Sequence, residues 1–340
     1  MTFLKTGRRA VGLDLSGPMV RAIALERRGK RLVVAGAALT AVAGDPDRQA
    51  MAQAIQATLV KAGADGEPVI SAIGGPEVVI RQVSLPSLPS SRILSALEMQ
   101  HKDFGLLAPE DAVLDAQIVR RTKDGGATEV LAVSAPRALV TEHTRTLAQA
   151  SITSAMLDVE PLALLNGAVH LTGLEPGELL VAVSIGARRT LLCLLSDHGP
   201  VVVRYLEVGA ADILERLQVG FGLAPDGVDA FARSLSEAAA VRAEEACRDV
   251  IERIAEDVRL SLAFYRSEYD RESLPRFALG GWLELRQIGR WLADRLGLGT
   301  PFELMDPLQK LEVTRPPAGV ESDTGGPQFL QAFGLALRGV

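Results

Sequence analysis

The stretch VGLDLSG at residues 11–17 decides the fold, because a near-copy, VAVSIGA at residues 181–187, opens the second half of the chain. Each stretch is an apolar strand that runs into a turn containing glycine, and two more apolar strands follow each of them. These strands are residues 20–25 and 31–34 in the first set, and residues 190–195 and 200–205 in the second. A matching pair of three-stranded meanders indicates a duplicated domain, which an isolated hairpin would not produce.

The elements that follow each meander also correspond. An amphipathic helix at residues 47–61 and a buried strand at 69–73 follow the first meander. A helix at 209–217 and, much later, a strand at 277–279 follow the second. Between these last two elements, the charge-rich residues 236–267 predict one long helix with a solvated face.

Residues from about 84 to 154 have no counterpart in the second half and predict an inserted subdomain. The run PSLPSS at residues 86–91 breaks a preceding strand and provides Ser90 or Ser91 to cap a helix that runs through Gly105. The remaining insert elements are strands at 112–120 and 129–134 and a helix at 136–150.

Together these patterns predict an α/β fold with two similar domains. We expect the first domain to span residues 1–175, with the insert inside it, and the second to span residues 176–340. Whether the C-terminal helix stays in the second domain or packs back on the first is left open.

Composition excludes several classes of protein. The chain has 340 residues, enough for about two domains, and its 48% apolar content is sufficient for packed cores. The net charge is −6 and the basic residues are scattered among acids, so we expect no nucleic-acid partner. Cys193 and Cys247 form neither a disulfide framework nor a metal cluster, which fits a reducing cytoplasm. No run of about 18 uncharged apolar residues occurs, so we expect membrane association only through a partner.

The two glycine turns are candidate phosphate sites. A tight turn with glycine and small hydroxyls presents backbone N–H groups to an anion at close range. Asp14, at the end of the first strand, would repel phosphate directly but suits a hydrated Mg²⁺ that bridges to the phosphates. An ordinary hairpin with glycine in its turn is the alternative for either stretch taken alone.

A third candidate is the pair Gly280-Gly281, which follows the strand at 277–279 and precedes a helix. Two adjacent glycines allow a close approach of the backbone and predict a shelf for adenosine. A plain turn between a strand and a helix is the alternative.

The order of these parts resembles the actin, Hsp70 and sugar-kinase superfamily, and within it the family of the type IV pilus assembly protein PilM. VGLDLSGPMVRAIAL at residues 11–25 is similar to the family's opening pattern, and VSIGARRT at 183–190 is similar to its second turn. The insert at 94–119, the helix at 257–265 and FGLALR at 333–338 also resemble family segments. The resemblance covers nearly the whole chain.

This resemblance implies two duplicated actin-like, ribonuclease H-like domains that bind ATP and Mg²⁺ between them. It also implies a cytoplasmic adaptor of a pilus or secretion platform, held at the inner membrane by the N-terminal peptide of a PilN-like membrane protein, and it leaves open a homo-oligomer. Asp14 would face Mg²⁺ through water. The residues expected to contact the nucleotide are Asp14, Ser16, Gly17, Ser184, Gly186, Arg188, Thr190, Gly209, Gly280 and Gly281.

Three departures from the family pattern weaken the expected nucleotide binding. Ser184 stands where the family has Asp, and Pro18 has no N–H to donate to a phosphate. Residues 230–234 lack the family's Glu and Lys near the adenosine. We therefore expect weak or lost ATP·Mg binding, no assigned catalytic residue, and at most very slow hydrolysis. A nucleotide-free scaffold and a small-molecule kinase remain as alternatives, although no stretch supplies both a general base and a sugar pocket.

Overall fold

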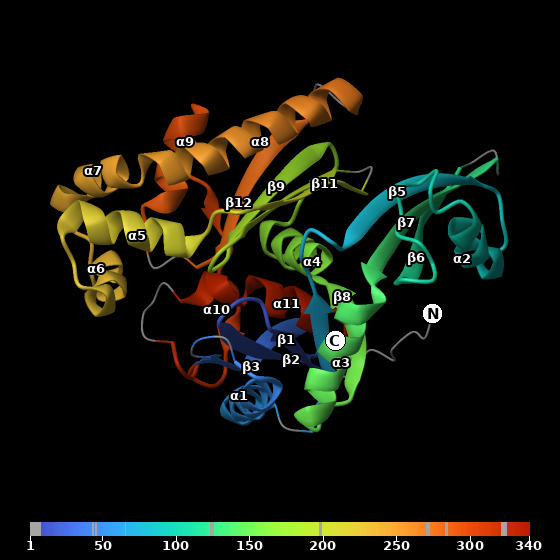
Figure 1. Cartoon of the computed structure of the whole chain (residues 1–340), viewed down its shortest axis with the longest axis horizontal. Helices are drawn as coiled ribbons and strands as arrows, with labels where there is room; N and C mark the ends of the chain where they lie inside the picture. Colours follow the sequence, from blue (N-terminus) through green and yellow to red (C-terminus); the bar gives the residue numbers. More distant parts are fainter. Residues whose placement is uncertain are drawn as a thin grey trace.

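Two sheets with corresponding strand order form the centre of the protein (Figure 1). The computed structural model describes residues 8–42, 44, 46–64, 66–122, 126–196, 199–269, 273–282, 285–320 and 325–340. The order is β14-β3-β2-β1-β4-β8 along the first sheet and β11-β10-β9-β12-β13 along the second. In each sheet the first strand of the meander pairs antiparallel with the second, and parallel with a later strand on its other side. The repeat in the sequence therefore extends to strand order and direction.

The bounds of the elements are as follows. The first sheet contains β1 (Arg9–Asp14), β2 (Met19–Arg28), β3 (Arg31–Ala41), β4 (Val69–Ile73), β8 (Ser154–Val159) and β14 (Glu312–Val313). The second contains β9 (Glu178–Ile185), β10 (Thr190–Ser196), β11 (Gly199–Leu206), β12 (Leu274–Gly281) and β13 (Glu303–Leu304). The helices outside the insert are α1 (Arg48–Lys61), α3 (Arg137–Gln149), α4 (Glu160–Thr172), α5 (Ala210–Phe221), α6 (Val228–Arg233), α7 (Glu237–Ala246), α8 (Arg248–Glu268), α9 (Ile288–Leu296), α10 (Pro307–Lys310) and α11 (Leu330–Ala336).

The helices and sheets stack in layers (Figure 1). Helices α1 and α3 cover the outer face of the first sheet, and α5 to α9 cover the outer face of the second. Helices α4 and α11 lie between the sheets, in an apolar core to which both sheets contribute. Phe329 and Phe333 are fully buried there, and burying side chains of this size contributes about 2–3 kcal/mol each. This middle layer holds the two sheets together.

The C-terminal segment returns to the first sheet. β14 pairs with β3, and α11 packs on β1 and α4. Gly12 permits this packing, because a Cβ atom there would lie 1.8 Å from the Ala332 carbonyl oxygen. Gly334 has the same role on the other side, where a Cβ atom would lie 1.8 Å from the Ala163 carbonyl oxygen. The predicted domain boundary at residues 175 and 176 lies between α4 and β9 and stays a prediction.

The insert forms a separate three-stranded sheet in the order β5-β7-β6. The helix expected in the insert at residues 136–150 is observed as α3, which covers the first sheet instead, because Leu147 and Ala150 are buried in the core beside α1. The elements of the insert are β5 (Val79–Pro86), α2 (Ser90–Met99), β6 (Ala112–Arg121) and β7 (Ala127–Pro136). It has its own small core, in which Leu85, Leu97 and Val130 are buried. Figure 1 shows the insert to one side of the layered body, with α2 farthest from the two central sheets.

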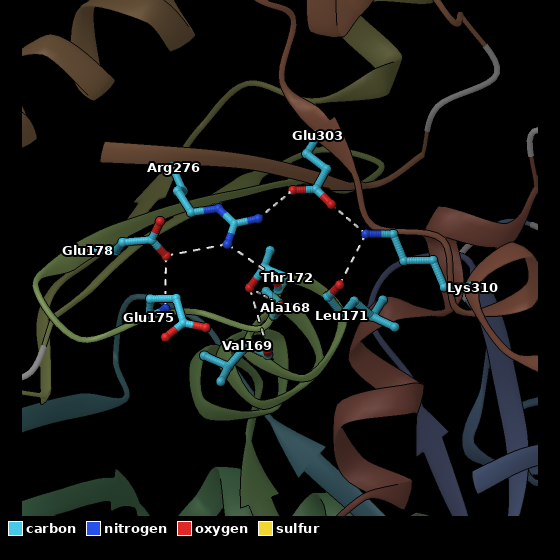
Figure 2. A network of polar contacts seen from close by, with 9 residues as sticks. All are labelled: Ala168, Val169, Leu171, Thr172, Glu175, Glu178, Arg276, Glu303 and Lys310. Atoms are coloured by element: carbon cyan, nitrogen blue, oxygen red, sulfur yellow. Dashed lines mark hydrogen bonds and ion pairs between the residues drawn. The ribbon is translucent and has the colours of Figure 1, made fainter. Parts of the chain in front are cut away.

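A charged network joins the two places where the chain passes between the sheets (Figure 2). The Arg276 guanidinium on β12 contacts the carboxylates of Glu178 at 3.3 Å and Glu303 at 3.1 Å. It also donates to the Thr172 carbonyl at 3.1 Å. Lys310 Nζ donates to the Leu171 carbonyl at 3.1 Å and contacts Glu303 at 2.5 Å. Both cations therefore lie at the C-terminal end of α4, where the helix dipole favours positive charge.

Three predicted elements differ from the observed ones. The single helix expected at residues 236–267 is divided into α7 and α8, because the backbone at Cys247 leaves the helical region with φ −94° and ψ 6°. The helix expected through Gly105 ends at Met99, and Gly105 itself has a φ of +61°. The strand expected at 31–34 runs to Ala41 as β3. Within the described ranges, no helix combines the length and the apolar character needed to cross a membrane.

Candidate functional site

A cavity of about 1220 Å³ lies at the ends of the two central sheets. Its walls include the two glycine turns, at residues 16–18 and 184–189, and the end of β12. Residues alternate between the two faces of a strand. Ala10 and Gly12 face the middle layer from β1, and Leu180 and Ala182 face it from β9. The same alternation brings Asp14 and Ser184 to the cavity.

The two turns approach each other closely. Gly17 has a φ of +72°, and a Cβ atom there would lie 3.4 Å from the Ala187 Cβ atom. Glycine suits this position because L side chains rarely adopt such a φ. The second turn is held from behind by the start of α5, where Ala210 N–H donates to the Gly186 carbonyl at 2.9 Å and Ala211 N–H donates to the Ala187 carbonyl at 2.8 Å. The second turn is therefore fixed by backbone contacts.

Asp14 is a buried carboxylate with both oxygens engaged. Oδ1 accepts a hydrogen bond from Ser16 N–H at 2.8 Å, and Oδ2 lies 3.3 Å from Arg21 Nη1. Arg21 also donates to the Ser16 carbonyl at 3.2 Å and, through Nε, to Gln328 Oε1 at 3.4 Å. Asp14 and Arg21 face each other in the register of β1 and β2, and their side chains are 4% and 8% exposed. A buried ion pair thus supports the first turn.

Glu160, at the start of α4, is a half-buried carboxyl group in the cavity wall. Burial raises its pKa to about 7, with a further contribution from the negative charge of Asp14. Tyr205 Oη on β11 donates to Glu160 Oε2 at 3.2 Å, which joins α4 to the second sheet. Gly74 makes room for this carboxyl group, since a Cβ atom there would lie 1.9 Å from Glu160 Oε2.

Seven of the ten predicted contact residues line the cavity. They are Asp14, Ser16, Gly17, Ser184, Gly186, Arg188 and Gly281. The backbone of β12 passes very close to β9 at Gly281, which has a φ of +88° and where a Cβ atom would lie 2.3 Å from the Ile185 carbonyl oxygen. Trp282 follows it in the cavity wall, and the expected adenosine shelf stays a prediction.

The other three predicted residues are close to the cavity but do not line it. Thr190 is fully buried and its hydroxyl donates to the Val208 carbonyl at 2.8 Å. Gly209 lies behind the second turn, where a Cβ atom would be 2.7 Å from the Gly186 carbonyl oxygen. Gly280 faces Leu330, and a Cβ atom added at Gly280 would lie 2.6 Å from the Leu330 Cδ2 atom. These residues support the walls of the cavity.

Several polar residues of the cavity wall have no role predicted from the sequence. They are Arg21, Glu160, Arg189, Tyr205, Glu207, Gln328 and Gln331. Arg21 could have been found, because a hairpin between residues 11–14 and 20–25 places it opposite Asp14. Nothing local to Glu160 in the sequence signals its contact with Tyr205.

The residues present do not fit a carboxylate-held Mg²⁺. Both Asp14 oxygens are engaged, Glu160 accepts from Tyr205, and Glu207 pairs with Arg189 at 2.8 Å. In the described part of the chain, no group of three or more His, Cys, Asp or Glu residues could hold a metal. The second turn offers the neutral Ser184. Mg²⁺ needs oxygen ligands in a strict octahedral arrangement, and the described residues of the cavity wall provide no free carboxylate to anchor one.

Comparisons with known proteins agree with this architecture. The family model described as "Type IV pilus assembly protein PilM" matches residues 12–340. Among solved structures, the PilM-PilN type IV pilus biogenesis complex is 25% identical, with a TM-score of 0.79 over 98% of this chain and 99% of that one. The ethanolamine utilization protein EutJ from Carboxydothermus hydrogenoformans is 14% identical, with a TM-score of 0.57 over 98% and 91%. MreB 5 of Spiroplasma citri bound to AMPPNP is 9% identical, with a TM-score of 0.54 over 96% and 94%. No curated protein matches the chain by sequence.

The two matching sheets, with paired turns facing a cavity, define an actin-like ATPase fold. Within this class, the chain belongs to the family of the type IV pilus assembly protein PilM. It is an actin-like adaptor of pilus assembly. The predicted α/β fold class and the predicted family are confirmed.

Proposed function

We propose that this adaptor binds the cytoplasmic N-terminal tail of a PilN-like membrane protein and is thereby held at the inner membrane. The observation that carries the proposal is the similarity, over nearly the whole of both chains, to a protein in the PilM-PilN complex. That similarity includes the insert, because the match covers 98% of this chain. The chain's own surface offers a groove that suits a peptide.

This groove, of about 740 Å³, lies between the insert and α3. Its lining residues are Glu110, Asp111, Pro136, Arg137, Ala138, Thr141, Glu142 and Arg145. The lining carries charges of both signs, which suits a tail with mixed polar groups rather than a polyanion. A tail held here would contact the insert and the first domain together.

Arg137 fixes the relative position of the two walls of the groove. Its Nη2 atom donates to the carbonyls of Pro109 at 3.2 Å and Ala112 at 2.5 Å, both in or beside β6. Its own backbone N–H donates to the Asp111 carbonyl at 2.8 Å. The groove is therefore formed before a peptide arrives, which reduces the entropy lost on binding.

The test is recruitment to membranes that contain the partner, with and without the insert. Ile80 pairs with Val133 in the antiparallel ladder of β5 and β7, so an Asn-Gly turn can replace residues 81–132 without moving either strand end. We expect the full chain to be recruited and the shortened chain to stay unbound. Equal recruitment of a folded shortened chain would contradict the proposal.

We further propose that the cavity between the paired turns is a nucleotide site with weak affinity. Seven predicted contact residues line this cavity. Its volume of about 1220 Å³ is slightly above the usual range for small-molecule sites. A nucleotide-free scaffold is the second candidate, favoured by Ser184 and by the absence of an N–H at Pro18. Calorimetric titration of the full chain with ATP distinguishes the nucleotide site from the scaffold, because a nucleotide-free scaffold would give no heat of binding.

A further inference from the structure

We infer that the cavity binds a phosphate-bearing anion without Mg²⁺, with the Arg21 guanidinium supplying the positive charge at the place where a metal would be expected. The inference rests on the proposed nucleotide site and specifies the chemistry of its ligand. It follows from the contacts of Asp14, from the equivalent positions in the second sheet, and from the donors that remain unpaired.

The first step concerns the Asp14 carboxylate. Its Oδ2 atom is 3.3 Å from Arg21 Nη1 and its Oδ1 atom accepts from Ser16 N–H. A hydrated Mg²⁺ beside Asp14 would lie next to a buried guanidinium of the same sign, and like charges repel strongly away from bulk water. Arg21 is itself held by the Ser16 carbonyl and by Gln328. The guanidinium therefore supplies the positive charge that a metal ion would otherwise provide beside Asp14.

The second step compares the two sheets. Asp14 pairs with Arg21 in the register of β1 and β2, whereas Ser184 pairs with Leu191 in the register of β9 and β10. The aligned positions in the second stretch thus hold a neutral hydroxyl and an apolar side chain. Only one of the two expected carboxylates is present, and it is already neutralised.

The third step concerns the remaining donors. Among the described residues, Arg21 Nη2 has no hydrogen-bond partner and is not one of the fully buried unpaired atoms, and Arg21 lines the cavity. The backbone N–H groups of Gly17, Ala187 and Arg188, in the cavity wall, also lack partners within the described ranges. Free N–H groups in turns form a cradle for anions, and the Nη2 atom of Arg21 can add a charge-assisted hydrogen bond to a phosphate oxygen.

The other charged side chains among the described residues of the wall do not oppose an anion strongly. Glu207 is paired with Arg189 at 2.8 Å, and Arg188 has no acidic partner within the described ranges. Burial raises the pKa of Glu160 to about 7, so this group carries less negative charge at neutral pH than an exposed glutamate. The cavity therefore favours a polyphosphate over a neutral ligand.

The experiment is calorimetric titration of the full chain with ATP, once in EDTA and once with excess Mg²⁺. We expect dissociation constants that agree within about threefold, and displacement of ATP by inorganic tripolyphosphate in EDTA. Asp14→Asn keeps the contact with Ser16 N–H but removes the charge that competes for Arg21, so it should tighten binding in EDTA by about threefold or more. Arg21→Gln should weaken it by about tenfold or more, with Arg28→Gln on the exposed end of β2 as the matched control.

Three results would overturn the inference. Binding that requires Mg²⁺ and is weakened by Asp14→Asn would show that Asp14 holds a metal, and it would leave the nucleotide site intact. ATP binding that tripolyphosphate does not displace would show that phosphate is not what the cavity recognises. Absence of binding in both buffers would overturn the inference and the nucleotide site together. The proposed binding to the PilN-like partner would be unaffected, because the membrane recruitment experiment tests it independently. If the Arg21→Gln variant does not fold, the inference is tested by the Mg²⁺ dependence of ATP binding to the unaltered chain and by the affinity of the Asp14→Asn variant.

Discussion

Arg21 Nη1 lies 3.3 Å from Asp14 Oδ2 inside the first sheet, and the aligned residues of the second sheet, Leu191 and Ser184, carry no charge. The two sheets thus share the geometry of their strands but differ in charge at these positions. This asymmetry gives the two glycine turns different electrostatic roles, and the first prediction follows from it.

Ser184→Asp adds a carboxylate to the cavity without a guanidinium opposite it, because Leu191 occupies that position. We expect ATP binding in EDTA to weaken by about tenfold, equivalent to about 1.4 kcal/mol, and part of the affinity to return with Mg²⁺. Ser184→Asn is the control of equal size. Calorimetry in both buffers gives the answer, and tighter binding of the Asp variant in EDTA would count against the assignment.

Glu160 should make stability depend on pH. Its pKa is about 7 when folded, raised by burial from an ordinary 4.5 in the unfolded chain. Between these values the folded state binds more protons, so this group lowers the free energy of unfolding as pH rises through the window. Glu160→Gln should therefore have little effect at pH 4.5 and should stabilise the protein by up to about 3 kcal/mol at pH 8.

Chemical denaturation across that pH range measures the effect. Glu237→Gln is the matched control, since Glu237 is an exposed carboxylate in the first turn of α7, as Glu160 is in the first turn of α4. For Glu237→Gln, the difference in the free energy of unfolding from the unaltered chain should stay constant between pH 5 and 8, to within about 0.5 kcal/mol. A Glu160→Gln curve parallel to that of the unaltered chain would refute the assigned shift.

Gly12→Ala should be strongly destabilising. The added Cβ atom would lie 1.8 Å from the Ala332 carbonyl oxygen and 2.7 Å from the Ala336 nitrogen, both backbone atoms that cannot move aside locally. We expect a loss of at least about 2 kcal/mol, because α11 must shift away from β1. Gly299→Ala, where nothing lies within 4 Å, should change stability by less than about 0.5 kcal/mol. Similar denaturation midpoints for both variants would disprove the close packing.

Arg276→Met should destabilise the connections between the sheets. The substitution removes two ion pairs and one bond to the end of α4, and it leaves Glu178 without its cation (Figure 2). The network is partly exposed, so solvent screening limits the loss to about 1–2 kcal/mol, and high salt should reduce it. Arg204→Met in the same sheet, which loses only a 3.5 Å contact to Asp257, is the control. Equal effects of both variants would show that the network adds nothing.

Much of the fold could be predicted because the repeated meanders are long and apolar. β1 and β9 are buried on both faces, and their continuous apolar runs are visible without knowledge of their partners. β14 and α10 were missed because elements of two and four residues carry no periodic signal. The return of α11 to β1 was left open as one of two alternatives, because a contact between distant segments has no local signal in the sequence.

The candidate site was predicted less completely. The glycine turns identified Asp14, Gly17 and Gly186 because turn chemistry is local. Thr190 and Gly209 have family-like identities but support backbone contacts behind the second turn. Glu160 gains its raised pKa from burial within the folded structure and pairs with Tyr205, 45 residues away. No local pattern predicts such an environment.

The central claim is that a membrane protein's N-terminal tail binds between the insert and α3. Thr141 and Thr144 provide a matched pair of sites on α3, since each hydroxyl donates to a carbonyl four residues earlier, but only Thr141 lines the groove. The direct measurement is calorimetric titration of the full chain and of Thr141→Trp and Thr144→Trp with the synthetic tail of the PilN-like partner. We predict one-to-one binding that Thr141→Trp weakens by about tenfold or more, because the indole fills the groove, and that Thr144→Trp leaves unchanged. Equal affinities for the two variants, or no binding to the unaltered chain, would contradict the account.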